Sequence, residues 1–306
     1  MLRWGMIGFA MLAVASCTET EGPVATEQET AIMTWPDLTS RPLPSPTATI
    51  RYREGEAGVI DLWLPAAEGP HPVVLMIHGG CWQKAIADRT LMNYAAEDLR
   101  QRGLAVWNIE YRGVDEPGGG YPGTFLDVAE AVDALRESSD EYDLDLSQVA
   151  AFGHSAGGHL AVWAASRTNL PSASPLYGED PLTLRAVVNS GGLADLEASE
   201  PVTLKSCLAD VADALTGQPS EQRPNPFSDT SPADLLPPQA TIVSVNGAQD
   251  RIAPSLLGEA FTALVLAAGG EAQYIEIKGA GHVELIAPGT EAFDTQAKLL
   301  VDALHN

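Results

Sequence analysis

A serine at position 155 lies in a stretch with little side-chain bulk, VAAFGHSAGGHLAVW, residues 149–163. Its pentapeptide GHSAG fits the pattern G-x-S-x-G, in which a strand turns sharply into a helix and presents the serine at the tip of the turn. The strained turn requires glycine two residues away on either side, because a Cβ there would clash with the chain. The apolar run before the turn and the helical pattern after it favour a nucleophilic role for Ser155 over a serine that only caps a helix.

A serine nucleophile needs a base that takes its proton, and the chain has six histidines. His71 precedes a predicted strand, His305 lies at the C-terminal tail, and His78 belongs to an HGG run. Two more flank Ser155 on its own turn and helix. The remaining candidate is His282, which follows the last predicted strand in a loop of small residues, GAGH.

The base in turn needs an acid that orients the imidazole and stabilises its charged form. Asp250, in TIVSVNGAQDRIAP, follows an apolar strand and is our first candidate. Asp195, in NSGGLADL, also follows a strand and stays open as the second. For either residue the alternative is an ordinary solvated carboxylate.

Apolar runs predict the strands that must position these residues. Strands buried on both faces of a parallel sheet are continuous apolar runs, and these recur along the chain. A shorter pair of apolar runs on either side of a glycine-containing turn predicts two more strands. In residues 272–278, apolar and polar side chains alternate, as is typical of a strand near the edge of a sheet. In order, the predicted strands are 47–52, 58–65, 72–78, 104–111, 149–153, 185–190, 240–247 and 272–278.

The segments between these strands have the periodicity of helices. Apolar residues there recur at a spacing near 3.6, and a glycine or proline marks several of the ends. The predicted helices are 89–103, 121–138, 156–168, 254–270 and 289–305. Strands that alternate with helices predict an α/β fold with a mostly parallel sheet. Residues 196–238 are irregular and proline-rich, and we expect them to form an excursion over the carboxyl edge of the sheet.

The composition narrows the class of partner. The formal net charge is −24, from 41 acidic and 17 basic residues, which argues against binding of nucleic acid or anionic lipid surfaces. The histidines lack metal-ligand spacing and the cysteines are isolated, so we expect no metal and no cofactor. Cys81 and Cys207 could form a disulfide, but sequence leaves this open, as it does the oligomeric state.

The N-terminus has the outline of an export signal, with one arginine, a short apolar run and small residues up to Cys17. The run VASC resembles a bacterial lipobox, which implies that Cys17 carries a lipid and becomes the new N-terminus. We therefore expect a signal peptide at 1–16, a disordered tether at 17–48 and a catalytic domain at 49–306. The predicted location is the cell envelope, at the outer membrane or its periplasmic face, with the membrane contacted through the lipid anchor only.

Taken together, the motifs HGGCW, NIEYRG, GGGYPGTFLDVAEAVDAL, GHSAGGHLAVW, NGAQDRIAP and GAGH resemble a known family over roughly residues 55–305. This family comprises the α/β-hydrolase esterases related to kynurenine formamidase and hormone-sensitive lipase, of the BD-FAE type. The resemblance implies an α/β-hydrolase fold with helices on both faces of the sheet. It also implies Ser155 as nucleophile, Asp250 as acid and His282 as base. The backbone amides of the oxyanion hole would be Gly80, Cys81 and Ala156.

The chain departs from the family pattern at the oxyanion loop and at the N-terminus. Cys81 stands where formamidase-like loops carry a bulkier residue, the third glycine of the lipase group is absent, and no large N-terminal cap is evident. Tyr111 and Arg112 match by position only, and packing at the strand end is the role that we expect for them.

The predicted activity is hydrolysis of a small-molecule carboxylic ester with a short acyl chain, through an acyl-enzyme formed by a Ser-His-Asp triad. An arylformamidase or amidase with the same triad is the main alternative. An oligopeptidase-like peptidase and a non-catalytic binding protein stay open as further alternatives.

Overall fold

The computed structural model describes residues 1–2 and 31–305, and the chain divides into two units, Met1–Thr30 and Ala31–Asn306. Almost all of the predicted signal peptide, Cys17 and the first part of the predicted tether lie outside the described residues. No helix in the described ranges has the length and apolar composition that crossing a membrane requires. The rest of this section concerns the second unit.

One eight-stranded sheet organises this unit, in the order β1-β2-β4-β3-β5-β6-β7-β8. The pairs β1–β2 and β2–β4 are antiparallel, and all other neighbours are parallel. The prediction of a mostly parallel sheet is thus confirmed, with β8 at an edge. The strands are β1 (Ala48–Arg51), β2 (Val59–Trp63), β3 (His71–Ile77), β4 (Ala105–Ile109), β5 (Leu144–His154), β6 (Ala186–Ser190), β7 (Thr241–Gly247) and β8 (Ala272–Ile277).

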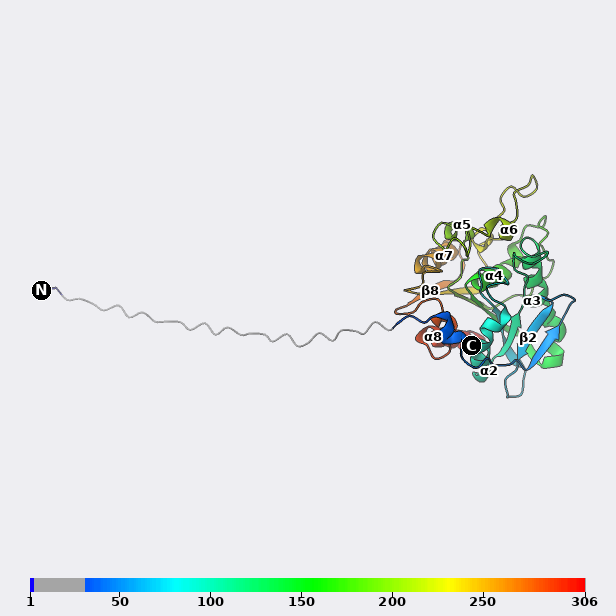
Figure 1. Cartoon of the computed structure of the whole chain (residues 1–306), viewed down its shortest axis with the longest axis horizontal. Coiled ribbons are helices and arrows are strands. Elements are labelled where there is room, and N and C mark those ends of the chain that lie inside the picture. The colour runs from blue at the N-terminus through cyan, green and yellow to red at the C-terminus, as the bar shows by residue number, and fades with distance from the viewer. Residues whose placement is uncertain (3–30, 306) are drawn as a thin grey trace. The chain divides into compact units, whose positions relative to one another are not determined.

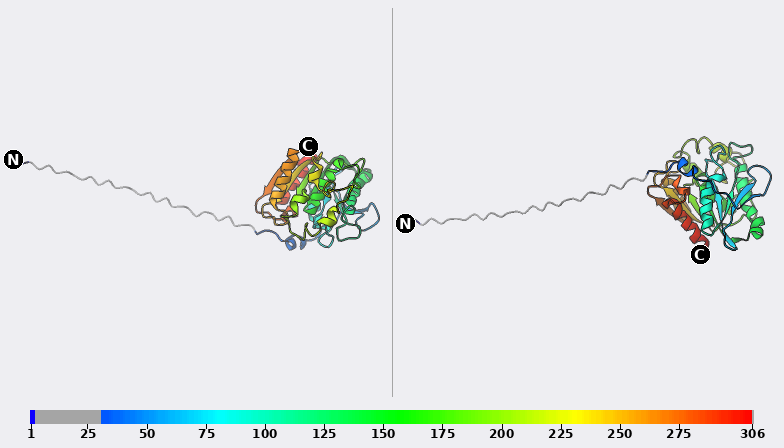
Figure 2. Two further views of the ribbon diagram at one scale, coloured as in Figure 1. Left: turned by 90° about the horizontal axis from the view of Figure 1, so that it is seen from above. Right: turned by 60° about the horizontal axis from the view of Figure 1, so that its bottom comes forward.

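Helices cover both faces of this sheet, as Figures 1 and 2 show. Helices α3, α4 and α7 contribute to the hydrophobic core on one face, and α2 and α8 contribute to the core on the other. Together with the connectivity, this is the α/β-hydrolase fold. The helices that pack on the sheet are α2 (Asn93–Gln101), α3 (Gly123–Tyr142), α4 (Ala156–Ala165), α7 (Ser255–Ala267) and α8 (Glu291–His305).

The continuous apolar runs are explained by this double burial. In β3, Val73, Leu75 and Ile77 face one core while Val74 and Met76 face the other, and none of these side chains is exposed. Side chains alternate across a strand, so a strand covered on both faces needs apolar residues at successive positions.

Several boundaries differ from the sequence prediction. Strand β5 begins at Leu144, five residues before the predicted run, and the first turn of the predicted 89–103 helix is a 3₁₀ helix, Arg89–Met92. The excursion at 196–238 contains three short helical pieces between irregular segments. These are α5 (Leu196–Ser199), α6 (Ala212–Thr216) and a 3₁₀ turn at Pro232–Leu235.

The predicted tether is wrong from residue 31 onward. A short helix, α1 (Trp35–Thr39), begins the second unit, and its Leu38 side chain is completely buried in the same core as α2 and α8. Arg41 donates a hydrogen bond to the carbonyl of Pro288 at 3.0 Å, and Tyr94 donates to the carbonyl of Arg41 at 3.3 Å. A polar composition suggested a linker, but one buried apolar side chain and long-range hydrogen bonds hold the segment to the folded unit.

Candidate active site

Ser155 lies at the sharp turn between β5 and α4. Its backbone has φ 54° and ψ −122°, a conformation that non-glycine residues seldom adopt. A Cβ on Gly153 would come within 2.1 Å of the Gly157 carbonyl oxygen, and a Cβ on Gly157 within 2.1 Å of the Ile77 carbonyl oxygen. The steric reason for the two glycines of G-x-S-x-G therefore holds here.

His282 and Asp250 meet at the carboxyl end of the sheet although 32 residues separate them. The Nδ1 of His282 lies 2.6 Å from Oδ2 of Asp250, and both side chains are buried. The other carboxylate oxygen of Asp250 accepts the backbone N–H groups of Ile252 (2.8 Å) and Ala253 (2.9 Å). Asp250 is thus held in one orientation by its own loop and can fix the tautomer and orientation of the imidazole.

Asp195, the second candidate for the acid, does not lie at the histidine. Its side chain accepts the backbone N–H of Ala198 at 3.0 Å and so caps the short helix α5. Both aspartates follow a strand; Asp250, the first candidate, lies at His282, and Asp195 does not.

A second histidine, His154, lies against His282. The two ring centroids are 4.4 Å apart, and Nε2 of His154 is 3.1 Å from the carbonyl oxygen of His282. Complete burial, with the neighbouring His282 as a lesser cause, holds the pKa of His154 well below 6.5, so its ring is neutral and donates through Nε2. Sequence pattern alone assigned no role to His154; its place at the end of β5, directly before the turn, was the signal available.

The loop after β3 brings backbone amides to the same place. Gly80, Cys81 and Trp82 all have positive φ, at 115°, 52° and 55°, and Gly80 and Cys81 line a cavity together with Ser155. In the described part of the chain, no hydrogen bond is formed by the N–H of Gly80, Cys81 or Ala156. Ala156 is the first residue of α4, where helix N–H groups point toward a bound anion.

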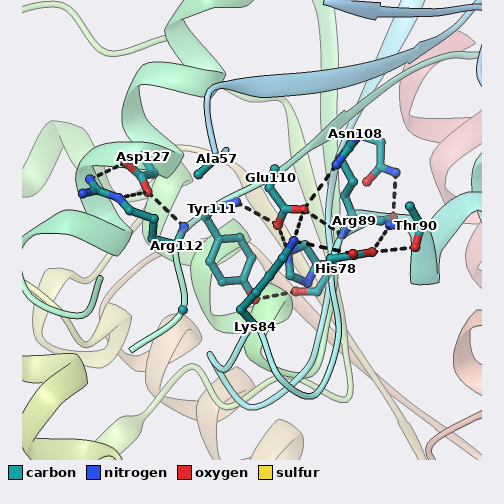
Figure 3. A network of polar contacts seen from close by, with 12 residues as sticks. Ala57, His78, Lys84, Arg89, Thr90, Asn108, Glu110, Tyr111, Arg112 and Asp127 are labelled. Carbon is teal, nitrogen blue, oxygen red and sulfur yellow. Dashed lines mark hydrogen bonds and ion pairs between the residues drawn. The ribbon is translucent and has the colours of Figure 1, made fainter. Parts of the chain in front are cut away.

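A buried polar network underlies this loop (Figure 3). The two ring nitrogens of His78 contact the Gly79 carbonyl (2.6 Å) and a Glu110 carboxylate oxygen (2.9 Å). Lys84 reaches the other Glu110 oxygen at 2.9 Å. Burial acts to raise the pKa of Glu110, but the charges and hydrogen bonds of His78 and Lys84 outweigh burial and hold the pKa below its usual 4.5.

Tyr111 does more than pack at the strand end. Its ring stacks on His78 with centroids 4.2 Å apart, and its hydroxyl donates to the His78 carbonyl at 3.0 Å. Burial raises the pKa of Tyr111 well above 10.0, so the hydroxyl keeps its proton. Arg112 lies on the other side of the strand end in Figure 3. Its Nε and Nη2 atoms each donate a hydrogen bond of 2.7 Å to one carboxylate oxygen of Asp127.

Cys81 and Cys207 form a disulfide, with their Cα atoms 4.7 Å apart. This bond joins the loop after β3 to the excursion between β6 and β7. The side chain of Gln83 reinforces the link by donating to the Ser206 carbonyl at 3.1 Å.

The cavity at Ser155 has a volume of about 230 Å³ and mostly apolar walls. We call it the inner cavity. No group of three or more His, Cys, Asp or Glu side chains within the described ranges is arranged to hold a metal ion. The cavity is lined by Trp35, Thr39, Gly80, Cys81, Ile86, Ala87, Leu91, His154, Ser155, Ile252 and His282.

Comparison with known families gives one match over most of the folded unit. The model of the BD-FAE family matches residues 60–264, a range that includes Ser155 and Asp250 and ends before His282.

Two curated relatives are about a quarter identical to this chain over the aligned residues. Esterase LipC of Mycobacterium tuberculosis is 28% identical over 243 residues, 76% of this chain and 58% of LipC. A rice protein named probable isoprenylcysteine alpha-carbonyl methylesterase is 24% identical over 250 residues, 78% of this chain and 58% of that protein. The chain thus spans little more than half the length of these relatives.

Solved structures share the fold at lower identity. Esterase B of Lactobacillus rhamnosis superposes with a TM-score of 0.70 at 20% identity, over 85% of this chain and 86% of that chain. A truncated carbohydrate esterase from gut microbiota superposes with a TM-score of 0.69 at 20% identity, over 86% of this chain and 98% of that chain.

Proposed function

The chain belongs to the BD-FAE family, and from this premise we propose that it hydrolyses carboxylic esters with Ser155 as nucleophile. The observation that carries the proposal is the convergence of three parts of the chain on the inner cavity. Ser155 at its strained turn, the His282 ring that Asp250 holds at 2.6 Å, and Gly80 and Cys81 of the loop after β3 all line it.

In the first half of the reaction, His282 takes the proton of Ser155 as the hydroxyl oxygen attacks the ester carbonyl. Asp250 holds Nδ1 of the imidazole, which leaves Nε2 as the atom that receives the proton. The negative charge on the carbonyl oxygen is stabilised by the N–H groups of Gly80, Cys81 and Ala156. One such donor typically contributes about 3–4 kcal/mol to the stability of the transition state.

Collapse of the tetrahedral intermediate breaks the bond to the alcohol oxygen, and His282 gives its proton to that oxygen. A water then attacks the acyl-enzyme with the same residues in the same roles, and the carboxylic acid leaves. A cavity of about 230 Å³ with apolar walls suits a short acyl chain.

A fluorophosphonate probe and an ester substrate test this function together. We expect the wild-type protein to be labelled and to hydrolyse p-nitrophenyl acetate, and Ser155→Ala to lose both, with kcat reduced by about 10⁴-fold or more. An N-formyl anilide assayed in parallel distinguishes the esterase from the amidase alternative. Wild-type protein that is folded but neither labelled nor active would contradict the proposal and favour a binding protein.

We also propose that Cys17 is lipidated and that the protein is anchored at the cell envelope. The lipobox-like VASC and the short apolar run before it support this. Inhibition of lipoprotein signal peptidase with globomycin should leave the unprocessed precursor, and Cys17→Ala should release the protein from the membrane fraction. Processing that is insensitive to globomycin would rule out the anchor.

A further inference from the structure

Two cavities meet beneath the N-terminal strap, which we define as residues 32–39. The inner cavity of about 230 Å³ contains Ser155. A larger outer cavity of about 820 Å³ lies on the side of Asp250 and His282 and does not include Ser155. The two share three lining residues, Trp35, Ile252 and His282, so these residues form the boundary between the cavities.

Trp35 is the largest side chain in this boundary. Its ring meets the rings of His154 and His282 edge-on, with centroid distances of 6.3 Å and 6.2 Å. It keeps 36% of its surface exposed, so it covers the two histidines without belonging to the core. Thr39, one helical turn later on α1, lines the inner cavity as well.

The strap is fastened to the loop that carries His282. Glu284 is buried and accepts the backbone N–H of Met33 through one carboxylate oxygen. Its other oxygen accepts the N–H of Gly281 at 3.0 Å. These two hydrogen bonds and the buried Leu38 side chain fix the position of Trp35 relative to the His282 imidazole.

The chemistry of the proposed reaction assigns an occupant to each cavity. The acyl carbon becomes bonded to the Ser155 oxygen, and Ser155 lines only the inner of the two cavities, so we assign the acyl chain to the inner cavity. The leaving oxygen receives its proton from His282, which lines both cavities. We assign the alcohol to the outer cavity, because it is the larger of the two and opens beside this imidazole. The rim of the outer cavity offers the polar side chains of Thr34, Gln249 and Arg251.

Resting on the proposed function, we propose that the substrates are short-chain acyl esters of bulky alcohols, and that Trp35 is a specificity-determining residue. The indole closes the inner cavity against long acyl chains. The same side chain forms one wall of the space that receives the alcohol. The strap lies outside residues 60–264, the range that the family model matches.

The test measures kcat/KM for p-nitrophenyl esters of increasing acyl length, from acetate to decanoate, with a constant leaving group. For wild-type protein we expect at least a tenfold decline from acetate to decanoate, as is usual when methylenes exceed an apolar pocket. In Trp35→Ala the cavities merge, and the decanoate-to-acetate ratio should rise about tenfold. Trp35→Phe should fall between the two, and thermal melts show whether each variant is folded.

The alcohol side is measured with phenyl and 1-naphthyl acetate. Wild-type protein should hydrolyse the two with kcat/KM values within about threefold of each other. Tyr177→Ala removes an exposed aromatic ring that lines neither cavity, and its acyl-length profile should match that of the wild type.

Two results would overturn the inference while leaving ester hydrolysis intact. One is a Trp35→Ala profile parallel to that of the wild type, whether at full or at uniformly reduced activity. The other is strong discrimination against the naphthyl ester by the wild-type protein. Failure of the wild-type protein to hydrolyse any ester in the series would instead refute the proposed function, and the inference with it.

Discussion

At the scale of single residues, the geometry of the site depends on how completely its buried polar groups are hydrogen-bonded. Asp250 accepts three hydrogen bonds, from the His282 ring and from two backbone N–H groups of its own loop. Three donors around one buried carboxylate hold it in a single orientation. These contacts make it a better orienting group than Asp195, which caps a helix.

The choice between the two aspartates can be tested directly. Asp250→Asn should lower kcat for p-nitrophenyl acetate by about 10⁴-fold, because the amide favours the wrong imidazole tautomer. Asp195→Asn keeps a side-chain oxygen that can cap α5 and should change kcat less than about twofold. Comparable losses in the two variants would contradict the assignment.

A pH dependence of stability follows from the buried histidines. Burial lowers the pKa of His159 to about 4, and its ring is fixed between Trp82 Nε1 (3.2 Å) and the Thr230 carbonyl (2.8 Å). At pH values between about 4 and the ordinary histidine pKa near 6.5, His159 is protonated in the unfolded chain but not in the folded chain. Stability therefore falls as the pH falls, by about 2 kcal/mol for this residue between pH 6.5 and pH 5. His154 acts in the same direction.

Urea unfolding at pH 7 and pH 5 measures this effect. The free energy of unfolding of the wild type should be lower at pH 5, and His159→Gln should reduce the difference by about 2 kcal/mol. His305→Gln, at an exposed position, should leave the difference unchanged. Equal pH dependence in wild type and His159→Gln would show that the buried ring does not resist protonation.

At the scale of elements, the ends of β3 and β4 act as one support for the loop that carries Gly80 and Cys81. His78 follows β3, and Glu110 and Tyr111 follow β4, which is the parallel neighbour of β3. Because the carboxyl ends of parallel strands meet at one edge, side chains distant in sequence converge there. This geometry explains why the NIEYRG and HGG motifs occur together in one chain.

Glu110→Gln removes the charge of this support while keeping its shape. His78 and Lys84 lose their ionic partner, the loop loses its fixed position, and kcat should fall about tenfold with KM nearly unchanged. Asp127→Asn is the matched control, because it weakens a buried ion pair with Arg112 away from the loop. We expect that control to lose stability and keep its kcat. If the two variants behaved alike, the role of Glu110 would be structural only.

At the scale of the whole molecule, long-range links fasten two outlying segments to the sheet's carboxyl edge. The strap is held by Leu38 and Glu284, and the excursion at 196–238 is held by the Cys81–Cys207 disulfide. The disulfide closes a loop of 126 residues. Such a bond suits a protein that folds in an oxidising compartment, in line with the proposed export.

Removal of the disulfide should destabilise the fold. Cys207→Ser is expected to lower the free energy of unfolding by about 2–4 kcal/mol, because the unfolded chain regains the freedom that the bond removes. Dithiothreitol should lower the melting temperature of the wild type to that of the variant and leave the variant unchanged. A melting temperature of the wild type that is insensitive to the reductant would contradict a stabilising disulfide.

Local pattern was enough to predict the order of strands and helices, the sharp turn at Ser155 and the convergence of His282 on the sheet's edge. Those features depend on residues near in sequence: apolar periodicity, two glycines around a serine, and loops after strands. The contact of Asp250 with His282, the contact of His154 with His282, the pairing of Cys81 with Cys207 and the folding of residues 31–48 depended on the tertiary structure. Each of these is a contact between segments far apart in sequence, and its free energy exists only once the core has brought them together.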